Sequence, residues 1–453
     1  MGNGRRSTSA ISTAISLFLT ILVLVPLSPA AKRSASAIEQ PSQARLSVSK
    51  SGSLSPKTRA KVFEEVWHIV DEKYYDPHFN GVNWAEVRDR YRPLIERAGS
   101  DDEFYQLLKR MVGELHDAHT RFHTPRERRE RKKQQAVSVG LTLFDVEGYP
   151  TVIDVDSTSD AARLGVRPGM RLESIEGRPA GDWLAGHRAG VDESSSERAT
   201  RLRLYRRLVD GEPGTPLKLG LRRTNGDYFE VTLLRRTESD APVVNWRRLP
   251  SGYGYLKLNV WKSPIHKEVK RALKGLKDAL GIIIDLRGNP GGQVDEVLEV
   301  AEHFFTTRVP FGRFTTRTGH SLHLFAGHSD HRDDVYQGPV AILVNESSGS
   351  GSELFAGVFQ ENGRAIVIGR RSCGCLLGIA KFRKVEGGGE IAVSELAYVS
   401  PRGHRLEGSG VVPDKQVTLT SSDLHEGRDA ALEAAESALR APLKTSPVGR
   451  LQE

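Results

Sequence analysis

The sequence predicts a multi-domain α/β protein, with a helical region first, a small strand-rich module second and an α/β domain last. Two strand–loop–helix units predict the α/β domain: Gly281–Leu286 leads through a tight loop into Val294–Phe304, and Pro339–Val344 leads into Leu354–Phe359. Buried strands that alternate with helices are typical of parallel sheets whose functional sites lie at the strand ends. The 453 residues are enough for two or three such cores.

The N-terminus predicts a secretory signal peptide. Two arginines precede an apolar segment, Ala10–Leu27, which ends in the small-residue cleavage pattern Ser28-Pro29-Ala30. We therefore expect residues 1–30 to direct export, and residues 31–54, rich in Ser, Ala and Gln, to form a flexible linker. An uncleaved membrane anchor is the alternative interpretation. The expected location is the periplasm, the cell envelope or the extracellular space, and peripheral membrane contact stays open.

The charge of the chain indicates no nucleic-acid partner. Its net charge of +8 arises from 65 basic and 57 acidic residues, a mild excess that concentrates only at residues 126–133 and 201–207. We interpret both stretches as solvated faces of the fold. A nucleic-acid-binding module would interleave aromatic residues with a basic surface, and we recognise no such module in the sequence.

The two cysteines of the chain, Cys373 and Cys375, are separated by one residue. On a strand they would point to opposite faces, so a disulfide between them would be strained. Further soft metal ligands are not evident nearby. We therefore expect two partly buried thiols, and neither a metal nor a cofactor.

Residues 55–133 indicate the helical region. It begins with apolar residues at helical spacing from Val62 to Val70. Two further helices are expected, at Trp84–Ile95 and Asp101–Leu115. The last one leads into the motif Asp117-Ala118-His119-Thr120.

Residues 134–238 indicate a separate strand-rich module. Val137–Leu143 and Thr151–Val155 are expected strands, and a short capped helix follows, with the glycine turn Gly165-Val166-Arg167-Pro168-Gly169 at its end. A hairpin around Asn225-Gly226 closes the module. This pattern resembles a PDZ domain, a family that binds peptide C-termini by adding a strand to a sheet edge.

The PDZ resemblance implies which residues bind a peptide. In such domains backbone N–H groups of one loop bind the terminal carboxylate. In this sequence those amides belong to Val139, Gly140 and Leu141. The alternative interpretation is that the module only braces the fold.

The segment Ser347-Ser348-Gly349-Ser350-Gly351 joins a buried strand to a helix. A serine on such a sharp turn is exposed, and the N-terminus of the following helix lies beside it. That end offers unpaired N–H groups and a positive dipole to a developing oxyanion. Because Gly/Ser turns also occur without any function, the neighbouring motifs decide between the two interpretations.

Taken together, the motifs resemble those of the carboxyl-terminal processing (tail-specific) serine peptidases. The resemblance covers nearly all of the expected mature chain. It implies a serine-type endopeptidase acting on proteins or peptides with free C-termini, with a core of the tricorn-core or crotonase-like type at residues 239–422 and a C-terminal helix and tail at residues 423–453. The sequence carries no signal for the oligomeric state. The supporting segments, in chain order, are Tyr74-Tyr75-Asp76-Pro77, Phe79-Asn80-Gly81, Asp117–Phe122, Asp285–Gly292, Gln360–Arg364 and Glu407–Asp414.

The resemblance places the nucleophile at Ser350. The backbone amides of Gly351, Gly291 and Gly292 would then form the oxyanion hole, because glycine lets the main chain approach a substrate carbonyl closely.

One departure from the family pattern concerns the base. Typical members pair the serine with a lysine and carry a glutamine four residues later. Here these positions hold Cys375 and Ile379. A serine without a base is a poor nucleophile, so another group must accept its proton.

Some members of the clan use histidine instead, and the chlamydial protease-like activity factor resembles this chain most. Matching its motifs assigns His119 as the base and Glu407 as its orienting carboxylate. With a histidine base, activity would rise through about pH 6 to 7. The alternatives are a structural His119, a Glu407 that pairs with neighbouring arginines, a thiol nucleophile at Cys375, and a degenerate peptidase fold that binds protein tails without cutting them.

Overall fold

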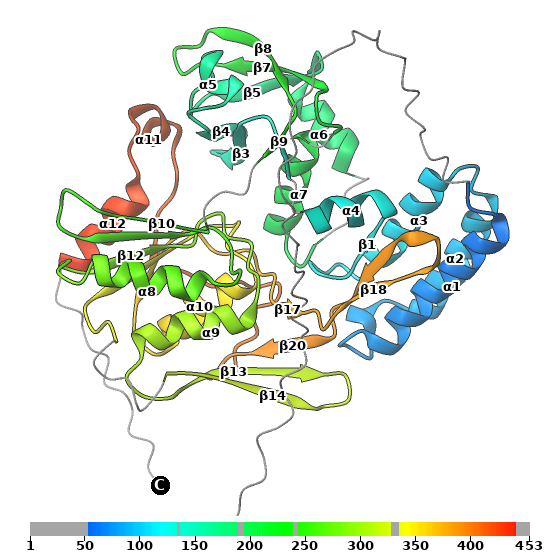
Figure 1. Ribbon diagram of the computed structural model, residues 1–453. Helices are drawn as coiled ribbons and strands as arrows, with labels where there is room; N and C mark the ends of the chain where they lie inside the picture. Colours follow the sequence, from blue (N-terminus) through cyan, green and yellow to red (C-terminus); the bar gives the residue numbers. More distant parts are fainter. Residues whose placement is uncertain are drawn as a thin grey trace, which may run out of the picture. The chain divides into compact units, whose positions relative to one another are not determined.

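The computed structural model describes residues 53–133, 136–188, 194–209, 211–238, 243–327 and 335–440 (Figure 1). The expected signal peptide and nearly all of the expected linker lie outside these residues. Within the described ranges, no helix combines the length and the apolarity that crossing a membrane requires.

A six-stranded sheet in the order β10-β11-β12-β15-β16-β21 forms the centre of the C-terminal region. Its neighbouring strands run parallel, except that β10 pairs antiparallel with β11. This arrangement confirms the α/β class expected from the sequence. The strands are β10 (Val244–Arg248), β11 (Gly254–Leu258), β12 (Ile282–Asp285), β15 (Val340–Val344), β16 (Ile366–Gly369) and β21 (Lys415–Gln416).

Helices cover both faces of this sheet. Ile282 and Ile284 of β12 pack in one core with α8, α9 and α10, whereas Ile283 packs on the opposite face with Ala435 and Leu439 of α12. A strand buried on both faces is an unbroken apolar run, which is why β12 and β15 were recognisable in the sequence. Figure 1 shows α8, α9 and α10 grouped beside the strands β10 and β12. The helices are α8 (Ile265–Gly275), α9 (Val294–Ala301), α10 (Gly351–Glu361) and α12 (Ala430–Arg440).

A second sheet, in the order β14-β13-β20-β17, packs on the same core as α9 and α10. The phenylalanines Phe311 and Phe314 of β13 and the ring of Tyr398 in β20 fill the contact. The strands are β13 (Val309–Thr316), β14 (Ser321–Ala326), β17 (Leu377–Gly378) and β20 (Leu396–Val399).

The N-terminal helical region has a core of its own, built from α1, α2 and α3. Each of these helices begins at a polar residue whose side chain accepts a backbone N–H: Ser55, Asn83 and Ser100. Strand β1 pairs with β19, so this region is joined to the C-terminal half of the chain. The elements are α1 (Pro56–Lys73), α2 (Trp84–Arg97), α3 (Asp101–Gly113), β1 (Arg121–His123), α4 (Pro125–Lys133), β18 (Phe382–Lys384) and β19 (Glu390–Ala392).

Residues 136–238 form the expected strand-rich module, with the sheet order β3-β4-β5-β7-β8. The hairpin around Asn225-Gly226 and the helix capped by Ser159 are both confirmed. The expected strand Val137–Leu143 is interrupted, because Gly140 adopts a left-handed φ of 77°. The elements are β2 (Ala136–Ser138), β3 (Leu141–Val146), β4 (Tyr149–Val155), α5 (Asp160–Arg163), β5 (Arg171–Ile175), β6 (Arg178–Pro179), α6 (Ala180–Arg188), α7 (Glu197–Val209), β7 (Pro216–Arg222), β8 (Tyr228–Leu234) and β9 (Arg236–Glu238).

The expected C-terminal helix is two helices. Gly427, with φ 66°, ends α11 (Ser421–Glu426) before α12 begins at Ala430. A left-handed glycine commonly ends an α-helix. The expected helix is therefore present, but it is divided into two shorter helices at Gly427.

Candidate active site

Ser350 lies at the turn between β15 and α10, where the sequence places the nucleophile. Its φ is 50°, a left-handed value that costs a non-glycine residue roughly 1–3 kcal/mol. Two hydrogen bonds fix this backbone: Ser350 N donates to Glu353 Oε2 and to the carbonyl oxygen of Cys375, both at 3.1 Å. The side chain is partly exposed. Its oxygen faces the backbone N–H of Glu353 in a helix capping box, and within the described residues its hydroxyl donates no hydrogen bond. The turn therefore presents a hydroxyl whose proton is not committed to another group.

The glycine loop that follows β12 packs directly against this serine. A Cβ on Gly291 would lie 2.6 Å from Ser350 Cβ, and one on Gly292 would lie 2.1 Å from the carbonyl oxygen of Trp261. Only glycine allows this approach. The amide of Gly291 donates to Asn289 Oδ1 at 2.9 Å.

Two of the three expected oxyanion amides have no acceptor. In the described part of the chain, the N–H groups of Gly292 and Gly351 donate no hydrogen bond. They are also close together, since a Cβ on Gly351 would lie 3.6 Å from Gly292 N. Two unpaired amides beside a serine hydroxyl are the arrangement that stabilises an oxyanion in acyl transfer.

Glu353 joins the serine turn to the segment after β16, and the sequence analysis missed it. Its carboxylate accepts hydrogen bonds from Ser350 N, from Ser372 Oγ at 2.6 Å, and from the amides of Gly374 (2.6 Å) and Cys375 (2.8 Å). Complete burial raises its pKa, although the four donors oppose that change. The spacing of Ser350 and Glu353 matches a helix capping box, which is the signal that could have revealed it.

Cys373 and Cys375 form a disulfide, so the expectation of two thiols is wrong. Gly374 has φ 73° and turns the chain back, which places both side chains on one side with a Cα–Cα distance of 5.2 Å. The argument from an extended strand therefore does not apply here. The pair packs against Ala118 and Ala199, and a disulfide-bonded Cys375 is not available as a thiol nucleophile.

His119 lies on the bend between α3 and β1. Asp117 organises this bend, because its Oδ1 accepts from His119 N and Thr120 N, both at 2.6 Å, and from Ser394 Oγ at 3.0 Å. The preceding residue, Ala118, belongs to one buried cluster with the disulfide, and the carbonyl oxygen of Cys375 in that disulfide accepts from Ser350 N. The fold thus brings the His119 segment to the serine turn across more than two hundred residues of sequence.

The environment of the His119 ring differs from the sequence expectation. Desolvation lowers its pKa to about 4; the charge of Asp117 opposes this change, and Arg121 and Arg203 reinforce it. The expected activity rise at pH 6 to 7 assumed an ordinary imidazole, and the lowered pKa of His119 moves the expected rise to lower pH. The ring nitrogen Nδ1 is buried and has no hydrogen-bond partner in the described part of the chain.

Glu407 is close to the His119 segment but does not hydrogen-bond to the ring. Its Oε1 accepts from the Ser195 hydroxyl, and its Oε2 accepts from Leu376 N at 2.6 Å. Ser195 Oγ in turn accepts from Ala118 N at 2.8 Å. Burial, reinforced by neighbouring carboxylates, raises the pKa of Glu407 to about 8. The structure therefore joins Glu407 to the histidine segment through Ser195.

A charged network holds the end of β12, where the glycine loop begins. Asp285 is buried, and although burial opposes its ionisation, Arg287 and Lys257 lower its pKa to about 2. Arg287 also pairs with Asp429, just before α12, at 2.7 Å. The network fixes the strand end from which the loop approaches Ser350.

A groove of about 1060 Å³ runs between β3 and α7. Leu141 and Leu143 of β3 line one wall, Leu202 and Tyr205 of α7 line the other, and the lining extends to Ser347 of the serine turn.

The expected carboxylate loop lies at the start of β3. Leu141 lines the groove, Val139 is buried, and Gly140 N donates to Ser138 Oγ at 2.9 Å. Residues 201–207, expected to be a solvated hinge or helix face, belong to α7, and Leu202, Tyr205 and Arg206 of this stretch also line the groove.

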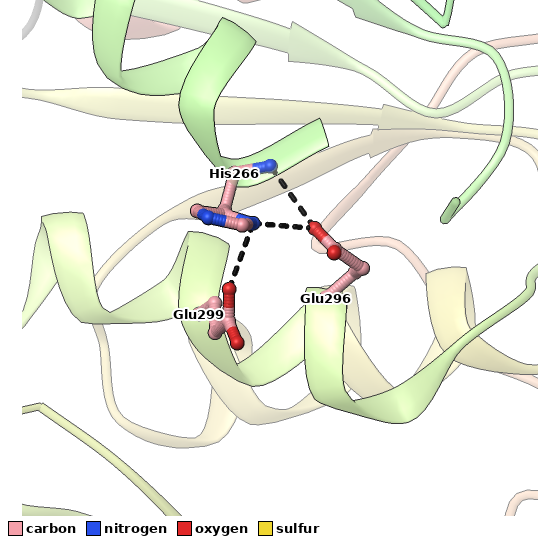
Figure 2. A group of neighbouring side chains, drawn as sticks. All are labelled: His266, Glu296 and Glu299. Atoms are coloured by element: carbon pink, nitrogen blue, oxygen red, sulfur yellow. Dashed lines mark hydrogen bonds and ion pairs between the residues drawn. The ribbon is translucent and has the colours of Figure 1, made fainter. Parts of the chain in front are cut away.

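Among the residues that the structure describes, one group of side chains has donor atoms close enough to hold a metal ion. His266 Nδ1 on α8 lies 2.8 Å from Glu296 Oε2 and 2.7 Å from Glu299 Oε2 on α9 (Figure 2). These separations are those of hydrogen-bonded pairs, so we interpret the group as a contact that holds α8 against α9. None of the three residues contacts the serine turn in the interactions described above.

Two family profiles match the chain. Residues 252–417 match Peptidase family S41, and residues 55–113 match the Tricorn protease C1 domain. The chain is 27% identical over 387 residues to Carboxyl-terminal-processing peptidase 3, chloroplastic, of Arabidopsis thaliana, covering 81% of this chain and 70% of the relative. It is 27% identical over 390 residues to the Carboxyl-terminal-processing protease of a Synechocystis species, covering 83% and 85%.

Solved structures confirm the fold. The photosystem II D1 C-terminal processing protease matches with a TM-score of 0.58 and 22% identity, over 85% of this chain and 98% of that chain. Mature CPAF matches with a TM-score of 0.65 and 14% identity, over 85% and 97%. The serine turn and the S41 profile together indicate a serine-type peptidase. More narrowly, residues 252–417 carry a Peptidase family S41 domain, and over most of its length the chain is similar to carboxyl-terminal-processing proteases.

Proposed function

We propose that this protein is an exported serine endopeptidase that cleaves proteins or peptides near their C-termini, with Ser350 as nucleophile and His119 as general base. The observation that carries the proposal is the Ser350 turn. A hydroxyl that donates no hydrogen bond there adjoins the unpaired amides of Gly292 and Gly351. Attack by Ser350 Oγ on a peptide carbonyl would place the developing negative charge beside those amides.

The low pKa of His119 supports its role as a proton acceptor. A ring with a pKa of about 4 is neutral at pH 7, and only a neutral imidazole can take the proton of the serine hydroxyl. Its segment contacts the disulfide beside Ser350 through Ala118. The family membership supplies the reaction class, and these residues supply the groups that would perform it.

The groove between β3 and α7 supports recognition of a C-terminal tail. An extended peptide can add to a sheet edge, with its side chains against an apolar helix face. Leu141, Leu143, Leu202 and Tyr205 provide such a lining, and the groove reaches Ser347. A tail bound there would lead the preceding substrate residues toward Ser350.

Fluorophosphonate labelling tests the proposal. The reagent should modify the purified wild-type protein and leave Ser350→Ala unmodified. Ser409→Ala is a matched control, because that hydroxyl only bonds the carbonyl of Arg405 within its own turn, and it should label like the wild type. A folded wild-type protein that does not react would contradict the proposed nucleophile.

A catalytically inactive tail-binding protein is the second candidate. The observations that favour it are Cys375 at the position where the family pattern has lysine, and the absence of a hydrogen bond to His119 Nδ1 in the described part of the chain. Binding of a C-terminal peptide by a protein that neither reacts with a fluorophosphonate nor cleaves the peptide would establish this candidate.

The export part of the proposal rests on the segment Ala10–Leu27. Expression of the full chain with N-terminal analysis of the mature protein tests it. Cleavage after Ala30 would support export, and an intact N-terminus retained in the cytoplasm would contradict it.

A further inference from the structure

Two buried polar atoms on the His119 bend have no hydrogen-bond partner within the described residues: Asp117 Oδ2 and His119 Nδ1. An unpaired buried polar group costs about 1–3 kcal/mol, and buried polar atoms in proteins are nearly always paired. The two atoms are complementary, because a carboxylate oxygen accepts and Nδ1 carries a proton in one neutral tautomer. One hydrogen bond between them would satisfy both.

The bend already brings the two side chains together. Asp117 Oδ1 accepts from the backbone N–H of His119 itself at 2.6 Å. Bonds from Thr120 N and Ser394 Oγ fix the same oxygen. The Tyr74 hydroxyl is a further donor to the carboxylate, and Oδ2 keeps the capacity to accept from a second donor. The carboxylate is held in place, with Asp117 only 4% exposed. The proposed bond requires the His119 side chain to rotate so that Nδ1 faces Oδ2.

Glu407, the carboxylate that the family resemblance suggests, is poorly suited to this role. Both of its oxygens accept from other donors, the Ser195 hydroxyl and Leu376 N. Burial raises its pKa to about 8, so at pH 7 most molecules carry a proton on it. A neutral carboxyl cannot stabilise an imidazolium by its charge.

We infer that Asp117 is the positioning residue that orients His119 and stabilises its protonated form. The inference rests on the proposed function of Ser350 and His119. A bond from Nδ1–H to Asp117 Oδ2 directs the lone pair of Nε2 toward the serine. Nε2 accepts the hydroxyl proton while Ser350 Oγ bonds to the substrate carbonyl carbon. His119 then returns that proton to the amine nitrogen as the C–N bond breaks.

Several charged and titratable groups face this pair. The Tyr74 and Tyr75 hydroxyls lie near Asp117; burial is the main cause that raises the pKa of each, and the charges of Asp117 and Glu407 add to it. Interaction with Tyr74 does not exclude His119, because a carboxylate oxygen can accept two hydrogen bonds.

The guanidinium groups of Arg121 and Arg203 both donate to the carbonyl oxygen of Ala118, and their charges lower the pKa of His119. Asp117 contributes the opposing charge. Contact between Asp117 and the ring strengthens the attraction between that carboxylate and the imidazolium. This raises the pKa of His119 and makes it a stronger base.

Asp117→Asn isolates this role. Asparagine keeps an acceptor for the three donors that Oδ1 binds, and it replaces Oδ2 by an NH₂ group that cannot accept from Nδ1–H. We expect kcat to fall about a hundredfold or more with little change in KM, since general-base catalysis contributes roughly 10²–10⁴-fold. The acid limb of kcat/KM should move to lower pH, because the anion that favours the imidazolium is gone.

Two further variants separate this effect from structural damage. Ser394→Ala removes one donor to the same carboxylate and should lower kcat by less than about fivefold. Glu407→Gln should lower kcat far less than Asp117→Asn does. A reversed order, with Glu407→Gln inactive and Asp117→Asn near wild type in kcat and pH profile, would overturn the inference while leaving Ser350 and His119 in place. Full activity of both Ser350→Ala and His119→Ala would instead refute the proposed function.

The tautomer of His119 provides a measurement that does not depend on how Asp117→Asn folds. Histidine labelled with ¹⁵N, in the Ser350→Ala protein and assigned by comparison with the Ser350→Ala/His119→Ala double variant, should show His119 protonated on Nδ1 at pH 7. Protonation on Nε2 alone would contradict the inference.

Discussion

Replacement of Glu407 by glutamine should stabilise the protein in a pH-dependent way. Glutamine has the shape of the protonated carboxyl and can still accept from Leu376 N and contact Ser195. In the wild type, folding raises the pKa of this group from 4.5 to about 8. Between these values the native state binds a proton that the unfolded chain releases, so wild-type stability falls as the pH rises through this window. The glutamine variant has no such proton to bind.

The size of the effect follows from the shift. Each pKa unit corresponds to about 1.4 kcal/mol. The free energy of unfolding that the wild type loses through Glu407 therefore approaches about 4 kcal/mol at pH 8 and is below about 1 kcal/mol at pH 5. Because Glu407 is partly exposed, solvent screening reduces this loss. We therefore expect the free energy of unfolding of Glu407→Gln to exceed that of the wild type by about 2–4 kcal/mol at pH 8.

Equilibrium denaturation at pH 5 and pH 8 measures the difference. Exposed Glu433→Gln is the control, and it should change stability by less than about 0.5 kcal/mol at either pH. Equal denaturation midpoints for Glu407→Gln and the wild type at pH 8, or a gain of the same size at both pH values, would refute the argument that Glu407 is neutral in the native state.

Three other predictions test the remaining parts of the site. Gly292→Ala should lower kcat by about 10²–10³-fold, since its Cβ would meet the Trp261 carbonyl at 2.1 Å and displace an oxyanion amide. Gly181→Ala is the control, because the space around Gly181 is open. Equal activity of the two variants would contradict the role of the Gly292 amide. Amidation of a substrate's C-terminus should weaken its cleavage, measured as kcat/KM, and equal rates would exclude carboxylate recognition at residues 139–141. Cys375→Ser should keep fluorophosphonate reactivity, because Cys375 contributes backbone groups to the serine turn, and a loss equal to that of Ser350→Ala would contradict this.

The sequence was sufficient where local pattern determines local structure. The apolar runs of β12 and β15 could only be buried strands, and the small residues after each predicted a tight turn at the same sheet edge. The choice of Ser350 within the second turn came from the resemblance to the peptidase family. The bend of Asp117 and His119 was recognisable as a motif, but its contact with the disulfide depends on tertiary packing.

The sequence could not reveal the features that depend on one glycine conformation or on distant contacts. The left-handed φ of Gly374 allows a disulfide that strand geometry forbids, and the φ of Gly140 divides an expected strand. Ser195 hydrogen-bonds to Glu407, which lies 212 residues later in the sequence, and no local sequence pattern predicts such a pair. The raised pKa of Glu407 and the lowered pKa of His119 both result from burial, which only the folded structure determines.

The site of fluorophosphonate modification tests the central claim most directly. Peptide mapping by mass spectrometry after reaction at pH 7 should locate the adduct on Ser350 in the wild-type protein. The same treatment of folded His119→Ala should yield at least a hundredfold slower modification of that residue, because removal of a general base costs about that much. An adduct on a different residue, or modification of Ser350 at the wild-type rate in His119→Ala, would contradict the assignment of Ser350 as nucleophile and His119 as its base.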